Sequence, residues 1–90
     1  LGAYGDRTVP TPHLEALAAR GTRFDRGYVP QASCSPARAA LLTGLMPMQN
    51  GQWGLAYRGS GYALHPGIAT LPQVLREAGY LTGIIGKLHV

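Results

Sequence analysis

The stretch that most constrains this chain is Cys34-Ser35-Pro36-Ala37-Arg38, which continues as a short apolar run that ends at Gly44. A serine followed by a proline is typical of a helix start, because a capping hydroxyl and a residue without an N–H suit the first turn. We expect a helix with Ser35 as N-cap, Pro36 at the first helical position and Gly44 as a left-handed stop. Cys34 then lies at the positive end of this helix and Arg38 about one turn inside it. The stretch therefore predicts a site for an anion or for developing negative charge.

The rest of the chain predicts alternating helices and strands. Residues 11–20 form an expected helix, with Thr11 as N-cap and Gly21 as the stop, and residues 70–78 form another, with a capping box at Thr70 and a stop at Gly79. Residues 22–29 and 80–85 are the expected strands, the second of them buried and parallel. Because parallel strands end at one edge of a sheet, we expect Cys34 and the Gly86-Lys87-Leu88-His89 stretch to converge there.

Two stretches together resemble a known family. Cys-Ser-Pro-Ala-Arg followed by Ala-Ala-Leu-Leu-Thr-Gly is similar to the signature of the type I sulfatases, whose C-x-P-x-R cysteine is oxidised to formylglycine. Gly-Tyr-Leu-Thr-Gly-Ile-Ile-Gly-Lys-Leu-His, at residues 79–89, resembles the second signature of that family. Residues 11–18, 49–55 and 83–90 look most like the corresponding parts of the heparan N-sulfatases, or sulfamidases.

The resemblance implies an α/β fold, an alkaline-phosphatase-like α/β/α sandwich, of which residues 1–90 would be the N-terminal part of the catalytic domain. The implied activity is hydrolysis of a sulfate ester or sulfamate to inorganic sulfate, with N-sulfoglucosamine of heparan sulfate as the favoured substrate. An O-sulfatase acting on aryl or sugar sulfates, or a phosphonate monoester hydrolase, is the alternative. The family also implies a periplasmic, extracellular or lysosomal location.

Four residues match the family's site. The resemblance implies that a formylglycine-generating enzyme converts Cys34 to an aldehyde, whose hydrate offers one oxygen to attack sulfur and a second hydroxyl to expel the sulfate afterwards. Arg38 would stabilise the hydrate oxygens, Lys87 would bind a sulfuryl oxygen, and His89 would assist deprotonation of the hydroxyl. The family also uses a divalent cation, usually calcium; the modified Cys34 would be its one ligand from residues 1–90.

Each of these residues also has a plainer interpretation. A single cysteine is often a small buried hydrophobe, or an unmodified thiolate whose pKa the helix N-terminus would lower. A lysine or histidine after a strand is ordinarily on the surface. Among the other polar residues, we expect Asp6 in a turn and His13 in solvent, and Arg58 or His65 could contact substrate from the long loop at residues 45–67.

Composition narrows the remaining classes of function. The formal net charge of +4 permits an anionic partner, but the basic residues are scattered and form no run typical of a nucleic-acid-binding arm. A non-catalytic basic binding module stays open as a different class of function. One cysteine excludes an internal disulfide, and no apolar run approaches the length of about 18 residues that a membrane span needs. A hydrophobic content of 46% predicts a globular, well-buried piece.

Overall fold

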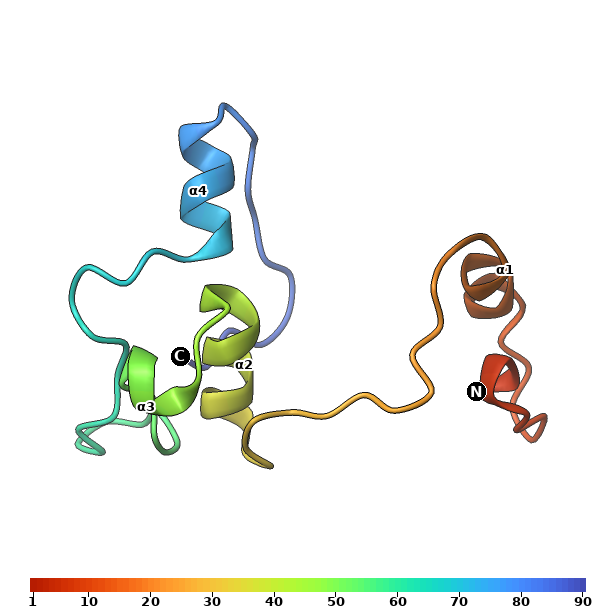
Figure 1. Cartoon of the computed structure of the whole chain (residues 1–90), viewed down its shortest axis with the longest axis horizontal. Helices are drawn as coiled ribbons and strands as arrows, with labels where there is room; N and C mark the ends of the chain where they lie inside the picture. Colours follow the sequence, from red (N-terminus) through yellow and green to blue (C-terminus); the bar gives the residue numbers. More distant parts are fainter.

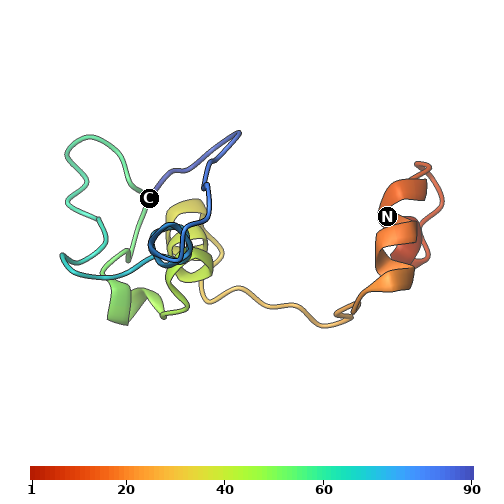
Figure 2. The ribbon, with the colours of Figure 1, turned by 90° about the horizontal axis from the view of Figure 1, so that it is seen from above.

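The computed structural model describes residues 1–90, and its regular elements are all helical. In chain order they are η1 (Gly2–Tyr4, a 3-10 turn), α1 (Pro12–Arg20), α2 (Cys34–Thr43), α3 (Pro47–Asn50) and α4 (Leu71–Glu77). Figure 1 shows α2, α3 and α4 grouped together, with η1 and α1 standing apart at the other end of an extended connection, and Figure 2 shows the same separation from above. We call residues 1–26 the N-terminal unit and residues 31–90 the α2 unit.

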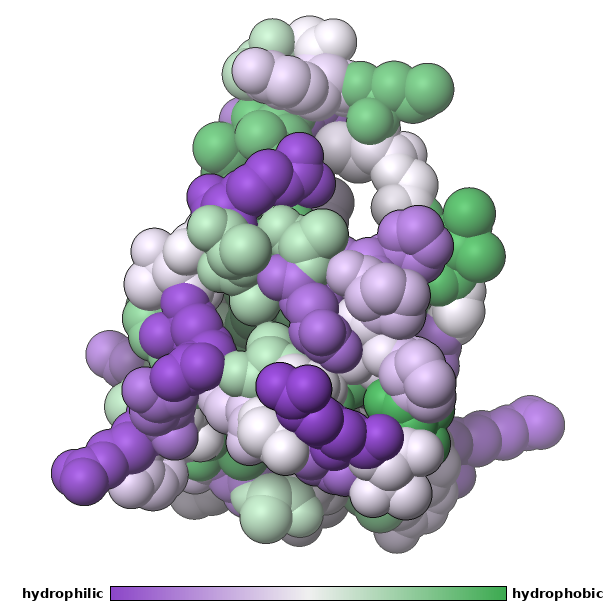
Figure 3. Space-filling model, turned by 90° about the vertical axis from the view of Figure 1, so that its right-hand side faces the viewer, coloured by the Kyte–Doolittle hydropathy of each residue, from purple (hydrophilic) through white to green (hydrophobic).

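The expectation of a well-buried globular piece is wrong for these 90 residues. The radius of gyration is 16.2 Å, against about 12 Å for a compact domain of this length. Seven of the 90 residues are buried, and Ala39 is the one buried hydrophobic residue. Apolar side chains stand at the surface among polar ones (Figure 3), and those of Leu81 and Ile85 are fully exposed. Composition measures how much apolar surface a chain could bury, whereas burial requires segments that pack against each other.

The two expected strands are also absent. Within residues 22–29, Arg23 and Phe24 bond to η1, and the stretch after residue 26 is the extended connection between the two units (Figure 1). Residues 80–85 run back from α4 towards α2 without a paired neighbour (Figure 1). A strand exists through ladder hydrogen bonds to another strand, and β-propensity alone does not supply the partner. The α/β/α sandwich is therefore not formed within residues 1–90.

The helix ends agree with the sequence predictions better than the strands do. The predicted starts at Thr11-Pro12 and Thr70 are confirmed, and Gln73 Oε1 accepts hydrogen bonds from the Thr70 N–H (2.7 Å) and hydroxyl (2.9 Å). At the end of α4, Gly79 has a φ of 88°, and the N–H groups of Gly79 and Tyr80 bond back to the carbonyls of Arg76 and Leu75. This is a Schellman motif, which requires the left-handed residue that glycine provides.

The start of α2 differs from the prediction by two residues. Ser33, not Ser35, is the N-cap, because its extended backbone (φ −145°, ψ 148°) places its carbonyl to accept the first helical bond, from Ala37 N–H at 3.1 Å. Pro36 takes the third helical position instead of the first. None of the first-turn N–H groups has an intrahelical partner, so proline fits any of these positions and does not fix the start. The left-handed stop at Gly44 (φ 70°) is confirmed.

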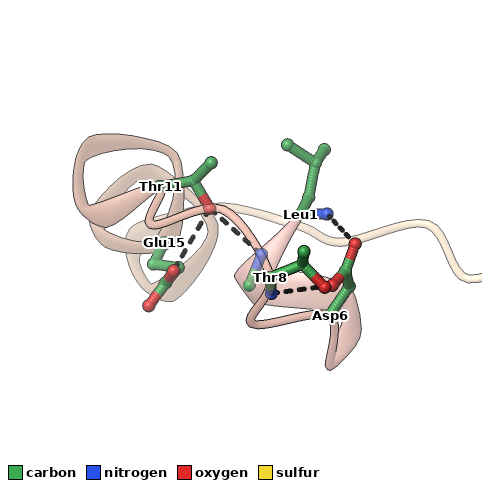
Figure 4. Close-up of polar contacts among 6 residues, drawn as sticks. Leu1, Asp6, Thr8, Thr11 and Glu15 are labelled. Carbon is green, nitrogen blue, oxygen red and sulfur yellow. Dashed lines mark hydrogen bonds and ion pairs between the residues drawn. The ribbon is translucent and has the colours of Figure 1, made fainter.

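Exposed polar contacts hold the N-terminal unit together. Thr11 Oγ1 accepts a hydrogen bond from the N–H of Gly2 (3.0 Å) and donates one to Glu15 Oε1 (3.2 Å), which ties η1 to α1 (Figure 4). Asp6 Oδ1 accepts the N–H of Thr8 at 2.9 Å in the turn between them (Figure 4). The turn role expected for Asp6 is therefore confirmed. No residue of this unit is buried.

Candidate active site

Cys34 is the first residue of α2, and its side chain is exposed and free. It lines a hollow of about 600 Å³ together with Arg38 and five further residues, namely Val29, Ala32, Ser33, Ala37 and Leu41. The walls are mostly apolar, so the thiol and the guanidinium are the reactive and charged groups in this hollow. Within these 90 residues the thiol is therefore unpaired and accessible from outside.

The backbone around Cys34 adds positive electrostatic potential. The side chain of Ser33 makes no capping hydrogen bond, and Pro36 has no N–H, so the first turn of α2 keeps the N–H groups of Cys34 and Ser35 outside the intrahelical pattern. Together with the helix dipole, such groups favour an anion at this end. The predicted placement of Cys34 at the positive end of a helix is confirmed.

Arg38 connects the two motifs that are far apart in the sequence. One of its guanidinium N–H groups, on Nη1, donates a hydrogen bond to the backbone carbonyl of Lys87, 49 residues further along the chain. The Gly86-Lys87-Leu88-His89 stretch is thereby held against α2, as the sequence predicted, although no sheet edge brings it there. Arg38 is partly exposed, so part of its charge remains available beside Cys34.

His89 has an unusual backbone and an unpartnered ring nitrogen. Its φ of 54° makes it the one non-glycine residue with a positive φ, a conformation that costs energy and often occurs at functional sites. Its Nδ1 is buried and has no hydrogen-bond partner within these 90 residues. A buried polar atom without a partner is uncommon, which makes this nitrogen a candidate to bond a group outside these 90 residues. The specific roles of Lys87 and His89 stay predictions, because no contact links either side chain to Cys34.

A buried polar network supports α2 and was not predicted. The side chain of Asn50 is fully buried, donates to the carbonyl of Leu45 (3.0 Å) and accepts the N–H of Gln52 (2.9 Å). Gln52 is also fully buried, and its amide donates to the carbonyl of Gly54 at 2.7 Å. The expected ordered loop at residues 45–67 is thus confirmed, with α3 inside it. Its sequence signals were the Pro47 start and the Asn50-Gly51 stop, where Gly51 has a φ of 89°.

The other polar candidates lie away from the hollow at Cys34. His65 closes the loop: its N–H donates to the carbonyl of Asn50 at 2.8 Å, and a Cβ at Gly51 would lie 2.8 Å from its Nδ1. Arg58 and His13 are exposed and make no hydrogen bond or ion pair, which agrees with the expectation of a solvated His13. The possible substrate contacts of Arg58 and His65 stay untested.

A complete metal centre is not present in residues 1–90. No group of three or more His, Cys, Asp or Glu side chains is positioned to hold an ion. The expectation that a modified Cys34 would be the one metal ligand from these residues stays a prediction. No helix has the length and apolar character needed to cross a membrane.

Comparison with known proteins adds a family match. The model of the family described as "Sulfatase" matches residues 1–90, the whole chain. The human N-sulphoglucosamine sulphohydrolase is 46% identical over 99% of this chain, and the bovine arylsulfatase A is 47% identical over 100% of it. An N-acetylgalactosamine-6-O-sulfatase of Bacteroides thetaiotaomicron is 38% identical, also over 100% of the chain.

These relatives are longer proteins with different substrates in their names. The chain spans about 18% of the length of each of the three. One is named for an N-sulfated sugar, one for aryl sulfates and one for an O-sulfated sugar. The three names thus each denote a sulfatase or sulphohydrolase and differ in the substrate that they give.

Proposed function

The chain belongs to the sulfatase family, and from this premise we propose that the whole protein hydrolyses a sulfate ester or sulfamate to inorganic sulfate. The observation that carries the proposal is the junction of the two signatures: Arg38, one turn into the Cys34 helix, binds the backbone of Lys87. Arg38 and Lys87, which are 49 positions apart in the sequence, thus meet near an exposed cysteine. That cysteine lies at a helix end that favours anions. The family implies an alkaline-phosphatase-like fold, and we propose its α/β/α sandwich for the whole protein.

The chemistry proposed for the site depends on conversion of Cys34 to formylglycine by a formylglycine-generating enzyme. The exposure and free state of the Cys34 side chain fit this modification. When present, the hydrated aldehyde supplies a nucleophilic oxygen and a second hydroxyl that allows sulfate to leave. The N–H groups of the first turn of α2 and the guanidinium of Arg38 favour negative charge beside that position.

Lys87 and His89 complete the proposed set. The ammonium group of Lys87 binds a sulfuryl oxygen and offsets charge that develops in the transition state. The imidazole of His89, whose buried Nδ1 has no protein partner, holds and transfers a proton at the attacking hydroxyl. The contact between Arg38 and the Lys87 carbonyl positions both residues, since it fixes the backbone of the segment that carries them.

For the substrate, we propose the N-sulfate of glucosamine, as in heparan sulfate. Support comes from the 46% identity with the human N-sulphoglucosamine sulphohydrolase. The 47% identity with bovine arylsulfatase A supports a second candidate, hydrolysis of O-sulfates. We also propose calcium as the divalent cation and a periplasmic, extracellular or lysosomal location. Residues 1–90 do not by themselves fit a calcium site.

The proposal is tested on the full-length protein from its native host. Peptide mass spectrometry across Cys34 should give the mass of an aldehyde or its hydrate. The same preparation should release inorganic sulfate from glucosamine N-sulfate faster than from 4-nitrophenyl sulfate; the reverse order would favour the O-sulfatase candidate. A free thiol in a host that has the converting enzyme would overturn the mechanism and leave the binding-module interpretation.

A further inference from the structure

The segment at residues 53–56 is fastened to the turn that carries Cys34, from both sides of the cysteine. The side-chain amide of Gln31, ahead of Cys34, donates to the carbonyl of Trp53 at 3.0 Å. The hydroxyl of Ser35, directly after Cys34, accepts the N–H of Ala56 at 2.9 Å. Direct hydrogen bonds to residues on both sides of Cys34 place this segment alongside the Cys34 turn.

The backbone of this segment is held stiffly. Gln52 precedes it with a fully buried side chain, which bonds to the carbonyl of Gly54 at 2.7 Å. The ring of Tyr62 packs directly on Gly54, so closely that a Cβ added there would lie 2.6 Å from the ring. Ser35 is itself fully buried, so its bond to Ala56 is shielded from water. The Oε1 of Gln52 has no partner, whereas its amide nitrogen and the Ser35 hydroxyl are bonded to this segment and restrict its backbone.

The segment exposes two large apolar side chains, Leu55 and Trp53, and Trp53 is the aromatic one. The residue is 54% exposed although its backbone is bonded to the Cys34 turn. The bond from Gln31 fixes the backbone of Trp53 next to the Cys34 turn. An exposed indole on a fixed backbone offers a flat apolar face at little conformational cost. Binding sites for small molecules commonly use such faces to contact the apolar part of a ligand, while polar groups bind the charged part.

From this arrangement we infer that Trp53 is a specificity-determining residue that contacts the ring bearing the sulfate group. The inference rests on the proposed function and deepens it. The groups near Cys34 bind the sulfuryl oxygens and the indole face packs on a flat ring next to them. A pyranose, through its C–H face, and an aryl ring can both pack on an indole in this way. The experiment below distinguishes these two kinds of ring.

The test measures binding, so that it does not depend on turnover. Full-length protein carrying Cys34→Ala is titrated calorimetrically with three probes: glucosamine N-sulfate, 4-nitrophenyl sulfate and inorganic sulfate. Addition of Trp53→Ala should weaken binding of a ring-bearing probe about tenfold, which corresponds to about 1.4 kcal/mol, and leave inorganic sulfate unchanged. Trp53→Phe should restore most of the affinity, because it keeps an aromatic face. Met48→Ala, an exposed apolar residue of α3 in the same loop, is the matched control and should change neither.

The pattern across probes decides the inference. Selective loss for glucosamine N-sulfate supports a sugar ring, and selective loss for 4-nitrophenyl sulfate supports an aryl ring. Equal loss for all three probes would overturn the inference, since Trp53 would then merely support the site. The inference is also overturned if the protein with Trp53→Ala binds all three probes as tightly as the Cys34→Ala protein does. The same holds if the Cys34→Ala protein binds neither ring-bearing probe more tightly than sulfate. Failure of the proposed function is a separate result, namely no sulfate release by the wild-type protein.

Discussion

The N-terminal unit and the α2 unit each contain an arginine that binds a distant backbone carbonyl, but in different surroundings. In the N-terminal unit, Arg23 donates to the carbonyl of Ala3 at 2.8 Å and lies 5.5 Å from the centre of the Tyr4 ring. In the α2 unit, Arg38 donates to the carbonyl of Lys87 beside an exposed cysteine. The first contact joins parts of a scaffold, whereas the second joins two parts of a candidate site.

Burial separates the two units further. All seven buried residues lie in the α2 unit, and three of them, Ser35, Asn50 and Gln52, are polar. Hydrogen-bonded polar groups have fixed directions, so they specify a geometry that apolar contacts alone leave looser. Burial within these 90 residues is therefore confined to the α2 unit, while the N-terminal unit is joined by solvent-accessible contacts that each contribute little to stability.

The largest expected difference between the two units is in activity. It is measured by changing one side chain in each unit and following sulfate release by the full-length protein. Cys34→Ala should lower kcat at least about 1,000-fold, because it removes the group that forms the nucleophile. His13→Ala, at an exposed position in the first turn of α1, should leave kcat within about twofold, as expected of a surface residue. Activity that survives Cys34→Ala would contradict the proposed mechanism and support a role for Cys34 in structure alone.

The same substitution can be made at the two arginines, and its effects on activity can be compared. Arg38→Lys keeps a positive charge but loses the planar fork, so it cannot serve both the Lys87 carbonyl and a sulfate oxygen. We expect kcat/KM to fall about 100-fold, the usual cost of removing one preorganised donor. Arg23→Lys should leave kcat/KM within about twofold, since its exposed contacts affect stability by about 1 kcal/mol or less. Equal losses in both variants would show that the two contacts act only through the fold.

Buried and exposed polar side chains can be compared through stability. Asn50→Ala removes hydrogen bonds inside the network and leaves the carbonyl of Leu45 and the N–H of Gln52 without that partner. Loss of a buried partner costs about 1–3 kcal/mol per group, so chemical denaturation of the full-length protein should show at least that loss. Thr11→Ala, which breaks contacts in the N-terminal unit, should cost about 1 kcal/mol. A larger loss from Thr11→Ala than from Asn50→Ala would contradict the assignment of order to the α2 unit.

The smallest effect concerns Asp6 and has a defined sign. The hydrogen bond from the backbone N–H of Thr8 lowers the pKa of Asp6 below its ordinary value of 3.8. A lowered folded pKa means that the ionised carboxylate stabilises the folded state above pH 3.8 and that this contribution is lost as the pH falls through the folded pKa. A carbon-13 NMR titration should therefore give Asp6 a pKa below 3.8. Thr8→Pro removes the N–H and the hydroxyl of Thr8, both of which lower the pKa of Asp6, and should return the pKa towards that value. No change would contradict the assignment to Thr8.

What could be predicted from the sequence followed from interactions between near neighbours. Helix starts at Thr11 and Thr70, the left-handed stops at Gly44 and Gly79, and Cys34 at a positive helix end depend on capping, on proline and on the tolerance of glycine for positive φ. The family was also determined by sequence, because its signatures are contiguous stretches. The start of α2 at Cys34 shows the limit of local rules, since proline fits several first-turn positions equally well.

The tertiary structure alone decided which distant groups meet. The contact between Arg38 and the Lys87 carbonyl, the bond between Ser35 and Ala56, and the buried pair Asn50 and Gln52 all depend on how the loop at residues 45–67 folds back on α2. No local pattern specifies such contacts, because each requires two segments to approach in three dimensions. The same reason explains the missing strands: residues 22–29 and 80–85 have suitable side chains, but a strand needs a neighbour with free backbone groups, and these residues have none in this structure.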